Sequence, residues 1–277
     1  MLTRRDAVFG SALLAGLPAS GGAAATEADS HAVPQRHASS RRHHRPLVLL
    51  DPGHGGKDPG CIGVHGTLEK HVALALGLEL RRQILASGRY RVAMTRDTDV
   101  FIPLADRVAR ARRLDAALIV SLHANASPDH TARGICVYRF AWRASDAHAA
   151  SRARWENSAE RYASPSTGAA SRQVLHILAS LMRRETQRHS AQLQRAIVEG
   201  LRPQVRMLPL AAPHARFAVL SAPDIAGVLV EMGFLTNRRE EMLLSRKSHR
   251  MVLAQTMHQA IDSYFARLPP AAVGRLG

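Results

Sequence analysis

The chain has 277 residues, of which 46% are hydrophobic and 4% aromatic, and its formal net charge is +16 at pH 7. This length accommodates one sizeable domain with tails, and the hydrophobic content excludes a globally disordered chain. A net charge this strongly positive indicates a polyanionic partner or surface. We find no nucleic-acid-binding motif and no aromatic stacking strand among the basic residues, so we expect no nucleic-acid partner.

The chain has two cysteines, Cys61 and Cys136. They form no CxxC pair, which excludes a cysteine-based zinc site. In an oxidising compartment the two thiols could form one disulfide, and the sequence leaves this pairing open because it does not show whether the sulfur atoms meet.

The first 25 residues have the organisation of a signal peptide. Arg4 and Arg5 precede a short apolar run to Leu17, and small residues lead to a cleavage site after Ala25. The apolar run is shorter than a membrane span, so we expect export to the periplasm without a transmembrane segment. The paired arginines favour a twin-arginine signal, with a general secretory signal as the alternative. Residues 26–45 are basic and lack periodicity, and they predict a disordered linker.

From Pro46 onward, apolar strands alternate with helices. A strand at 47–50 is followed by a helix at 67–87, which ends at Gly88. The segments expected next are a strand at 90–95, a helix at 104–114, strands at 116–122 and 134–140, a helix at 171–202, and strands at 217–220 and 227–230. Asn237 and Glu240 form a helix-capping signal, and the last helix is expected at 242–265. This alternation predicts a single α/β domain over residues 46–268, with a twisted, largely parallel sheet flanked by helices and a tail at 269–277.

Three of these strands lead into side chains that bind metals or transfer protons. His54 follows the first strand, His123 follows the strand at 116–122, and Glu231 follows the strand at 227–230. Glu69 begins the helix after the first loop. Because the carboxyl ends of parallel strands meet at one edge of a sheet, we expect all of these side chains there. Two histidines and two glutamates without a competing cysteine suit zinc.

A catalytic zinc ion takes three protein ligands and keeps one position open for water. His54, Glu69 and His123 supply that number, and Glu231 is then the carboxylate that accepts the water proton and passes it to the leaving nitrogen. Each residue alone has a simpler explanation, since single histidines are commonly structural and Glu69 suits the first turn of any helix. His65 and His71, which flank Glu69, are expected outside the site.

A series of motifs in fixed order resembles the zinc-dependent N-acetylmuramoyl-L-alanine amidases of the AmiA/AmiB/AmiC type. The motifs are LDPGHGGKDPG at 50–60, EK at 69–70, MTRDTDVFIPL at 94–104, SLHAN at 121–125 and VEMGFLTN at 230–237. The resemblance spans residues 47–265 and implies one zinc ion per chain, held by His54, Glu69 and His123, with Glu231 catalytic. It also implies cleavage of the amide between N-acetylmuramic acid and L-alanine of the peptidoglycan stem peptide, in cell-wall remodelling and daughter-cell separation.

Residues 142–170 are an insertion between a strand and the long helix. The stretch at 154–160 resembles the regulatory helix of the division-associated members, which blocks the groove until an activator protein displaces it. The resemblance implies that Glu156 blocks the site, with Glu160 as the second candidate, and the alternative is an exposed connector. We therefore expect peptidoglycan and an activator as partners of a monomeric enzyme. A non-catalytic peptidoglycan-binding regulator on the same fold, or a zinc peptidase acting within the stem peptide, stays open as an alternative.

Overall fold

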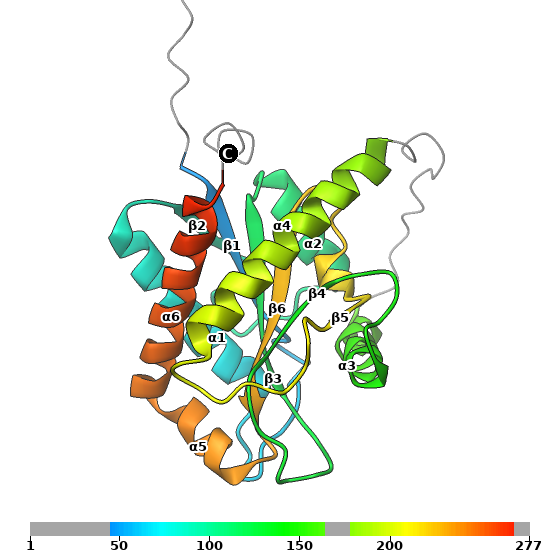
Figure 1. Ribbon diagram of the computed structural model, residues 1–277. Coiled ribbons are helices and arrows are strands. Elements are labelled where there is room, and N and C mark those ends of the chain that lie inside the picture. Colours follow the sequence, from blue (N-terminus) through cyan, green and yellow to red (C-terminus); the bar gives the residue numbers. More distant parts are fainter. Residues whose placement is uncertain (1–44, 164–177, 269–277) are drawn as a thin grey trace, which may run out of the picture. The chain divides into compact units, whose positions relative to one another are not determined.

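The computed structural model describes residues 45–163 and 178–268 (Figure 1). The predicted signal peptide at 1–25, almost all of the linker at 26–45, the tail at 269–277 and the start of the helix at 171–202 lie outside the described residues. Within the described part, every helix is too short or too polar to cross a membrane.

A six-stranded sheet forms the centre of the domain, in the order β2-β1-β3-β6-β4-β5. Strands β2 (Arg91–Met94), β1 (Leu47–Pro52), β3 (Leu118–Asn125) and β6 (Ala226–Phe234) run parallel to their neighbours. Strand β4 (Cys136–Phe140) is antiparallel to β6 and pairs with the short β5 (His214–Ala215). The predicted α/β fold with a largely parallel sheet is confirmed, and the reversed direction of β4 is a feature that the sequence pattern does not reveal.

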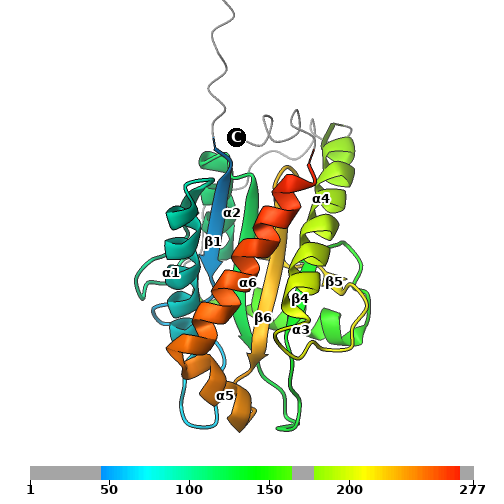
Figure 2. The ribbon, with the colours of Figure 1, turned by 60° about the vertical axis from the view of Figure 1, so that its left-hand side comes forward.

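Helices cover both faces of this sheet. Figure 2 shows α1 (Glu69–Ser87), α6 (Lys247–Ala266) and α4 (Leu178–Leu201) across one face. The other face is covered by α2 (Leu104–Arg113) and α3 (Ala147–Asn157). Successive residues of β1 alternate between the two cores, because strand side chains point to opposite faces. A strand that is buried on both faces needs an unbroken apolar run, which explains the composition of β1 and β3.

The helix ends agree with the capping signals. Gly88 ends α1 with a left-handed φ of 65°, a conformation that glycine adopts without a steric penalty. The Asn237 side chain accepts hydrogen bonds from the backbone N–H groups of the first turn of α5 (Arg238–Ser245). The predicted helix at 242–265 is however divided, because Arg246 adopts an extended conformation between α5 and α6.

Two strand predictions need correction. The segment 217–220 is not a strand: Ala218–Leu220 forms a short 3₁₀ helix whose apolar side chains fill the core beneath α2. A short apolar run is compatible with either structure, so the composition of this segment alone does not distinguish a strand from a 3₁₀ helix. Strands β3 and β6 also extend further than predicted, with the result that His123 and Glu231 lie within strands rather than after them.

Candidate metal centre and active site

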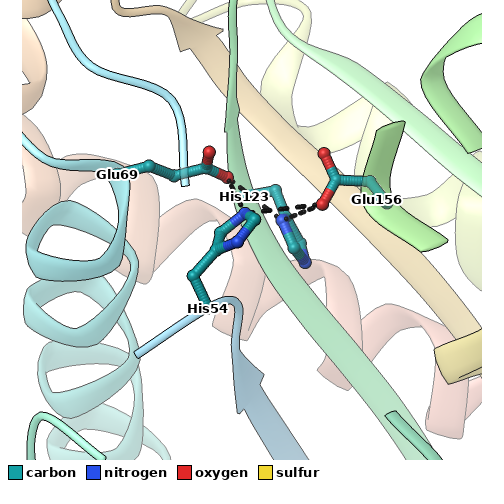
Figure 3. A group of neighbouring side chains, drawn as sticks. All are labelled: His54, Glu69, His123 and Glu156. Atoms are coloured by element: carbon teal, nitrogen blue, oxygen red, sulfur yellow. Dashed lines mark hydrogen bonds and ion pairs between the residues drawn. The ribbon is translucent and has the colours of Figure 1, made fainter. Parts of the chain in front are cut away.

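Four buried side chains converge at the carboxyl ends of the parallel strands. The ligand atoms of His54, Glu69, His123 and Glu156 all lie within 4.8 Å of one another (Figure 3). Oε1 of Glu69 lies 3.0 Å from Nε2 of His54 and 3.1 Å from Nδ1 of His123. The structure therefore brings together the three side chains that the sequence predicts as metal ligands, and it adds Glu156 from α3, whose Oε2 lies 2.9 Å from the same His123 nitrogen.

His54 is held in one orientation by its own loop. Its φ of 60° is unusual for a residue other than glycine, and such backbone strain is concentrated at functional sites. Nδ1 lies 2.8 Å from Oδ2 of Asp58, while the buried Nε2 faces the carboxylates of Glu69 and Glu156. A proton on Nδ1 leaves the Nε2 lone pair directed at the cluster, which is the arrangement that a metal ligand requires.

His123 is fixed by a chain of hydrogen bonds that starts in the sheet. Its Nε2 lies 3.2 Å from Oγ of Ser121, and that hydroxyl donates to Asp51 at 2.6 Å. The buried Arg107 donates to Asp51 at 2.8 Å, and it holds the pKa of Asp51 below its usual value against the effect of burial. The serine oxygen is thus left to accept the Nε2 proton, and Nδ1 is free to bind a metal.

The backbone holds the Glu69 carboxylate. Oε2 accepts a hydrogen bond from the N–H of Cys61 at 2.8 Å, and Oε1 accepts one from the N–H of Ala124 at 2.9 Å. Gly53 leaves room for the site, since a Cβ there would lie 2.3 Å from the imidazole of His123. Glu69 begins α1 and is fully buried, so its position serves the cluster rather than only the first turn of the helix.

The electrostatics of the cluster favour a bound cation. Burial alone would lower the pKa of His123, but attraction to the Glu156 carboxylate together with hydrogen bonds to Glu156 and Glu69 raises this pKa to about 10. Burial would raise the pKa of Glu69, yet His54 and His123 hold it well below its usual range. Two buried carboxylates thus stabilise positive charge between them, and with two imidazole nitrogens they form a donor set able to hold a divalent metal.

Replacement of Asp58 by Asn should weaken metal binding. The amide would donate to Nδ1 of His54 and move the imidazole proton to Nε2, where it blocks the lone pair. We expect the metal affinity of Asp58→Asn to fall ~10- to 100-fold, the usual effect of losing a carboxylate behind a histidine ligand, as measured by competition with a chromophoric chelator. The exposed Asp97, which lies 3.6 Å from Arg81, provides the matched control Asp97→Asn. Equal affinities of the two variants would contradict this role of Asp58.

Glu231 lies beside the four-residue cluster of Figure 3 but is not part of it. It pairs with His123 in the register of β3 and β6, and it is fully buried. Neither carboxylate oxygen has a hydrogen-bond partner in the described structure. Burial raises the pKa of Glu231 to about 8, although the guanidinium of Arg152, whose Nε lies 3.6 Å from Oε1, opposes this rise. A carboxyl group with such a pKa is suited to exchange protons near neutral pH.

The remaining candidates lie outside the cluster. His65 binds Glu241 at 2.8 Å, and His71 lies 3.7 Å from Asp99, so both are excluded from the site as predicted. Glu160 is exposed. Cys61 and Cys136 are free thiols buried in the core, and the Cys61 thiol donates to the carbonyl of Ala124.

The amidase-like motifs are matched by comparisons with known proteins. The model of the Amidase_3 family, described as N-acetylmuramoyl-L-alanine amidase, matches residues 48–263. The chain is 39% identical to the amidase AmiC of Neisseria meningitidis serogroup B over 226 residues, 81% of this chain but only 54% of that protein. It is 36% identical to the amidase AmiA of Salmonella typhimurium, over 85% of this chain and 86% of that protein.

A comparison with solved structures agrees on the fold. The CwlD amidase from Clostridioides difficile, in complex with the GerS lipoprotein, is similar with a TM-score of 0.58 and 23% identity, over 80% of this chain and 98% of that chain. At this identity the likeness concerns the fold alone. The family model matches well over half of the chain and the similarity to AmiA extends over 85% of it, and the chain therefore belongs to the Amidase_3 family of N-acetylmuramoyl-L-alanine amidases.

Proposed function

We propose that this chain hydrolyses the amide between N-acetylmuramic acid and L-alanine of peptidoglycan, using one zinc ion held by His54, Glu69 and His123. The observation that carries this proposal is the convergence of these three side chains beside the buried carboxyl of Glu231, which accepts no hydrogen bond in the described structure. When bound, zinc supplies a water whose pKa is lowered to about 7 and polarises the scissile carbonyl.

The protein itself supplies orientation and proton transfer. Asp58 and Ser121 hold the two imidazole rings so that one nitrogen of each faces the cluster. Glu231 takes the proton from the attacking water and returns it to the leaving nitrogen of L-alanine, since its raised pKa suits both steps.

The described structure corresponds to a closed state of the site, in which α3 occupies the position that the substrate carbonyl and water would need. Glu156 is the fourth member of the cluster, with Oε2 lying 2.9 Å from His123 and 3.5 Å from His54. We assign it as the group that blocks the site, in preference to the exposed Glu160. A partner that displaces α3 would then activate the enzyme, which is compatible with a related amidase having been solved with a lipoprotein bound.

Replacement of Glu156 by Gln should activate the full chain. Loss of the carboxylate weakens the closed state, and we expect dye-labelled peptidoglycan to be released ~10-fold faster, which corresponds to a shift of ~1.4 kcal/mol between closed and open states. The exposed Glu160, on the turn after α3, provides the matched control Glu160→Gln. A rate equal to that of the control would show that Glu156 does not block the site.

The mass of the products tests the reaction itself. An amidase leaves intact glycan and free stem peptides that begin with L-alanine, whereas a peptidase acting within the stem leaves truncated peptides attached to glycan. Release of nothing by wild type, by Glu156→Gln and by a chain lacking residues 143–166 would support a non-catalytic peptidoglycan-binding regulator instead. The periplasm as location and a monomeric state complete the proposal, and fractionation and sedimentation measure them.

A further inference from the structure

Arg152 connects the blocking helix to the catalytic strands through contacts that do not involve the metal ligands of β3 and α1. It lies on α3, one turn before Glu156, and its side chain is only 6% exposed. Nη1 donates to Oδ1 of Asn125 at 2.5 Å, Nη2 lies 3.2 Å from Glu156, and Nε lies 3.6 Å from Glu231. A guanidinium on this helix therefore occupies the space beside the catalytic carboxyl.

Asn125 has unsatisfied hydrogen-bonding capacity at this point. Its Oδ1 accepts from the N–H of Ala126 at 2.9 Å as well as from Arg152, and these two donors fix the orientation of the amide. The Nδ2 group is buried and has no partner in the described structure, although the residue is only 1% exposed. Buried amide donors are nearly always paired, so an unpaired one beside an active site indicates a partner that is present in another state.

A cavity of about 380 Å³ adjoins both residues. Besides Asn125 and Arg152, its lining includes Ser127, His148, Trp155 and Thr236. Asn125 ends β3 two positions beyond His123 and also lines the cavity, so the same strand contributes to the cavity and to the cluster. A chain that extends from the scissile bond into this cavity would pass the Asn125 side chain.

We propose that Asn125 positions the substrate by binding the first peptide units of the stem, and that Arg152 occupies this subsite while α3 is closed. An asparagine amide offers one donor and one acceptor, as a peptide unit does, and so pairs with a peptide in both directions. The guanidinium imitates the N–H groups of the substrate toward Oδ1 and the protonated leaving amine toward Glu231. This inference rests on the proposed amidase function and assigns the stem peptide to Asn125, Ser127 and Thr236, the part of the cavity lining that does not belong to α3.

The alternative is that Arg152 acts only by orienting Glu156, with which it pairs four residues along the helix. A double-mutant cycle separates the two roles. We expect Arg152→Met, which keeps the aliphatic packing, to release dye-labelled peptidoglycan ~10-fold faster than wild type, and to add to the effect of Glu156→Gln in the double variant. The exposed Arg154 on the same helix provides the control Arg154→Met.

Hydrogen exchange of the α3 amides gives a readout independent of turnover, and Arg152→Met should exchange faster than Arg154→Met. If Arg152→Met matches Arg154→Met in both rate and exchange, Arg152 does not hold the helix closed. If the double variant is no faster than Glu156→Gln, Arg152 acts only through Glu156. Either result overturns the proposal for Arg152.

The subsite is tested in the activated Arg152→Met/Glu156→Gln background, with soluble muramyl peptide as substrate. Asn125→Ala should raise KM ~10-fold or more while kcat, zinc content and melting temperature change little, the signature of lost substrate binding. A fall in kcat together with zinc loss would instead make Asn125 a structural support for His123 and overturn the assignment. Absence of hydrolysis in every variant, including the activated background, would overturn the proposed function itself.

Discussion

Glu231→Gln will retain zinc and the native fold but release peptidoglycan ~10²- to 10⁴-fold more slowly than the parent, the usual contribution of a general acid–base group. The amide is nearly isosteric, so the burial of residue 231 within β6 is preserved. The glutamine amide, however, does not take a proton from water or return one to the leaving nitrogen. The background should be Glu156→Gln, in which the site is open and the loss is measured against a high rate.

The control and the metal content decide how this result is interpreted. Glu199 is an exposed glutamate that lies 3.5 Å from Arg267, far from the cluster in the fold, and Glu199→Gln should leave the rate unchanged. Zinc is measured on the purified variants by a chromophoric chelator. Loss of zinc together with activity in Glu231→Gln would make Glu231 a ligand, and the acid–base role would then be wrong.

His54→Ala and His123→Ala will lose both zinc and activity. Each removes one of the three proposed ligands, so we expect affinity to fall by more than the ~10- to 100-fold that follows the loss of a group behind a ligand. The measurements are zinc content after dialysis and release of dye-labelled peptidoglycan. His65→Ala is the matched control, because this half-exposed histidine binds Glu241 and lies outside the cluster.

Two results would contradict the assignment of His54 and His123 as zinc ligands. If His65→Ala loses as much zinc as His54→Ala, the loop that carries both residues matters more than the His54 nitrogen. If His123→Ala keeps its zinc, the metal lies elsewhere. Addition of a strong chelator to wild type followed by zinc should remove and restore activity, whereas neither histidine variant should recover.

The gathering of the candidate metal ligands at one edge of the sheet was predictable because it depends on local sequence patterns. Apolar runs before His54 and Glu231 indicate strands, and parallel strands place their carboxyl ends at one edge. Glu69 was the weakest of these predictions, since a glutamate at the start of a helix is common. Its role depends on backbone donors of Cys61 and Ala124, which lie far apart in the sequence and meet only in the fold.

The contacts that α3 makes with the cluster could not be derived from the residues alone. Arg152 and Arg154 are two arginines on one short helix, yet one is buried against Asn125 and the other is exposed. This difference depends on which face of the helix contacts the rim, and α3 follows β4, whose direction is reversed relative to β6. The direction in which β4 pairs with β6 is a long-range property that an apolar run does not encode.

The inclusion of Glu156 in the metal cluster has a consequence for how the ion is held. Two events that stabilise the same conformation must stabilise each other by equal free energies. If zinc favours the docked helix through Glu156, then docking raises the affinity for zinc by the same factor. The resting enzyme would thus store its metal more securely than the working enzyme, and each activation would expose the ion to competition from chelators in its surroundings.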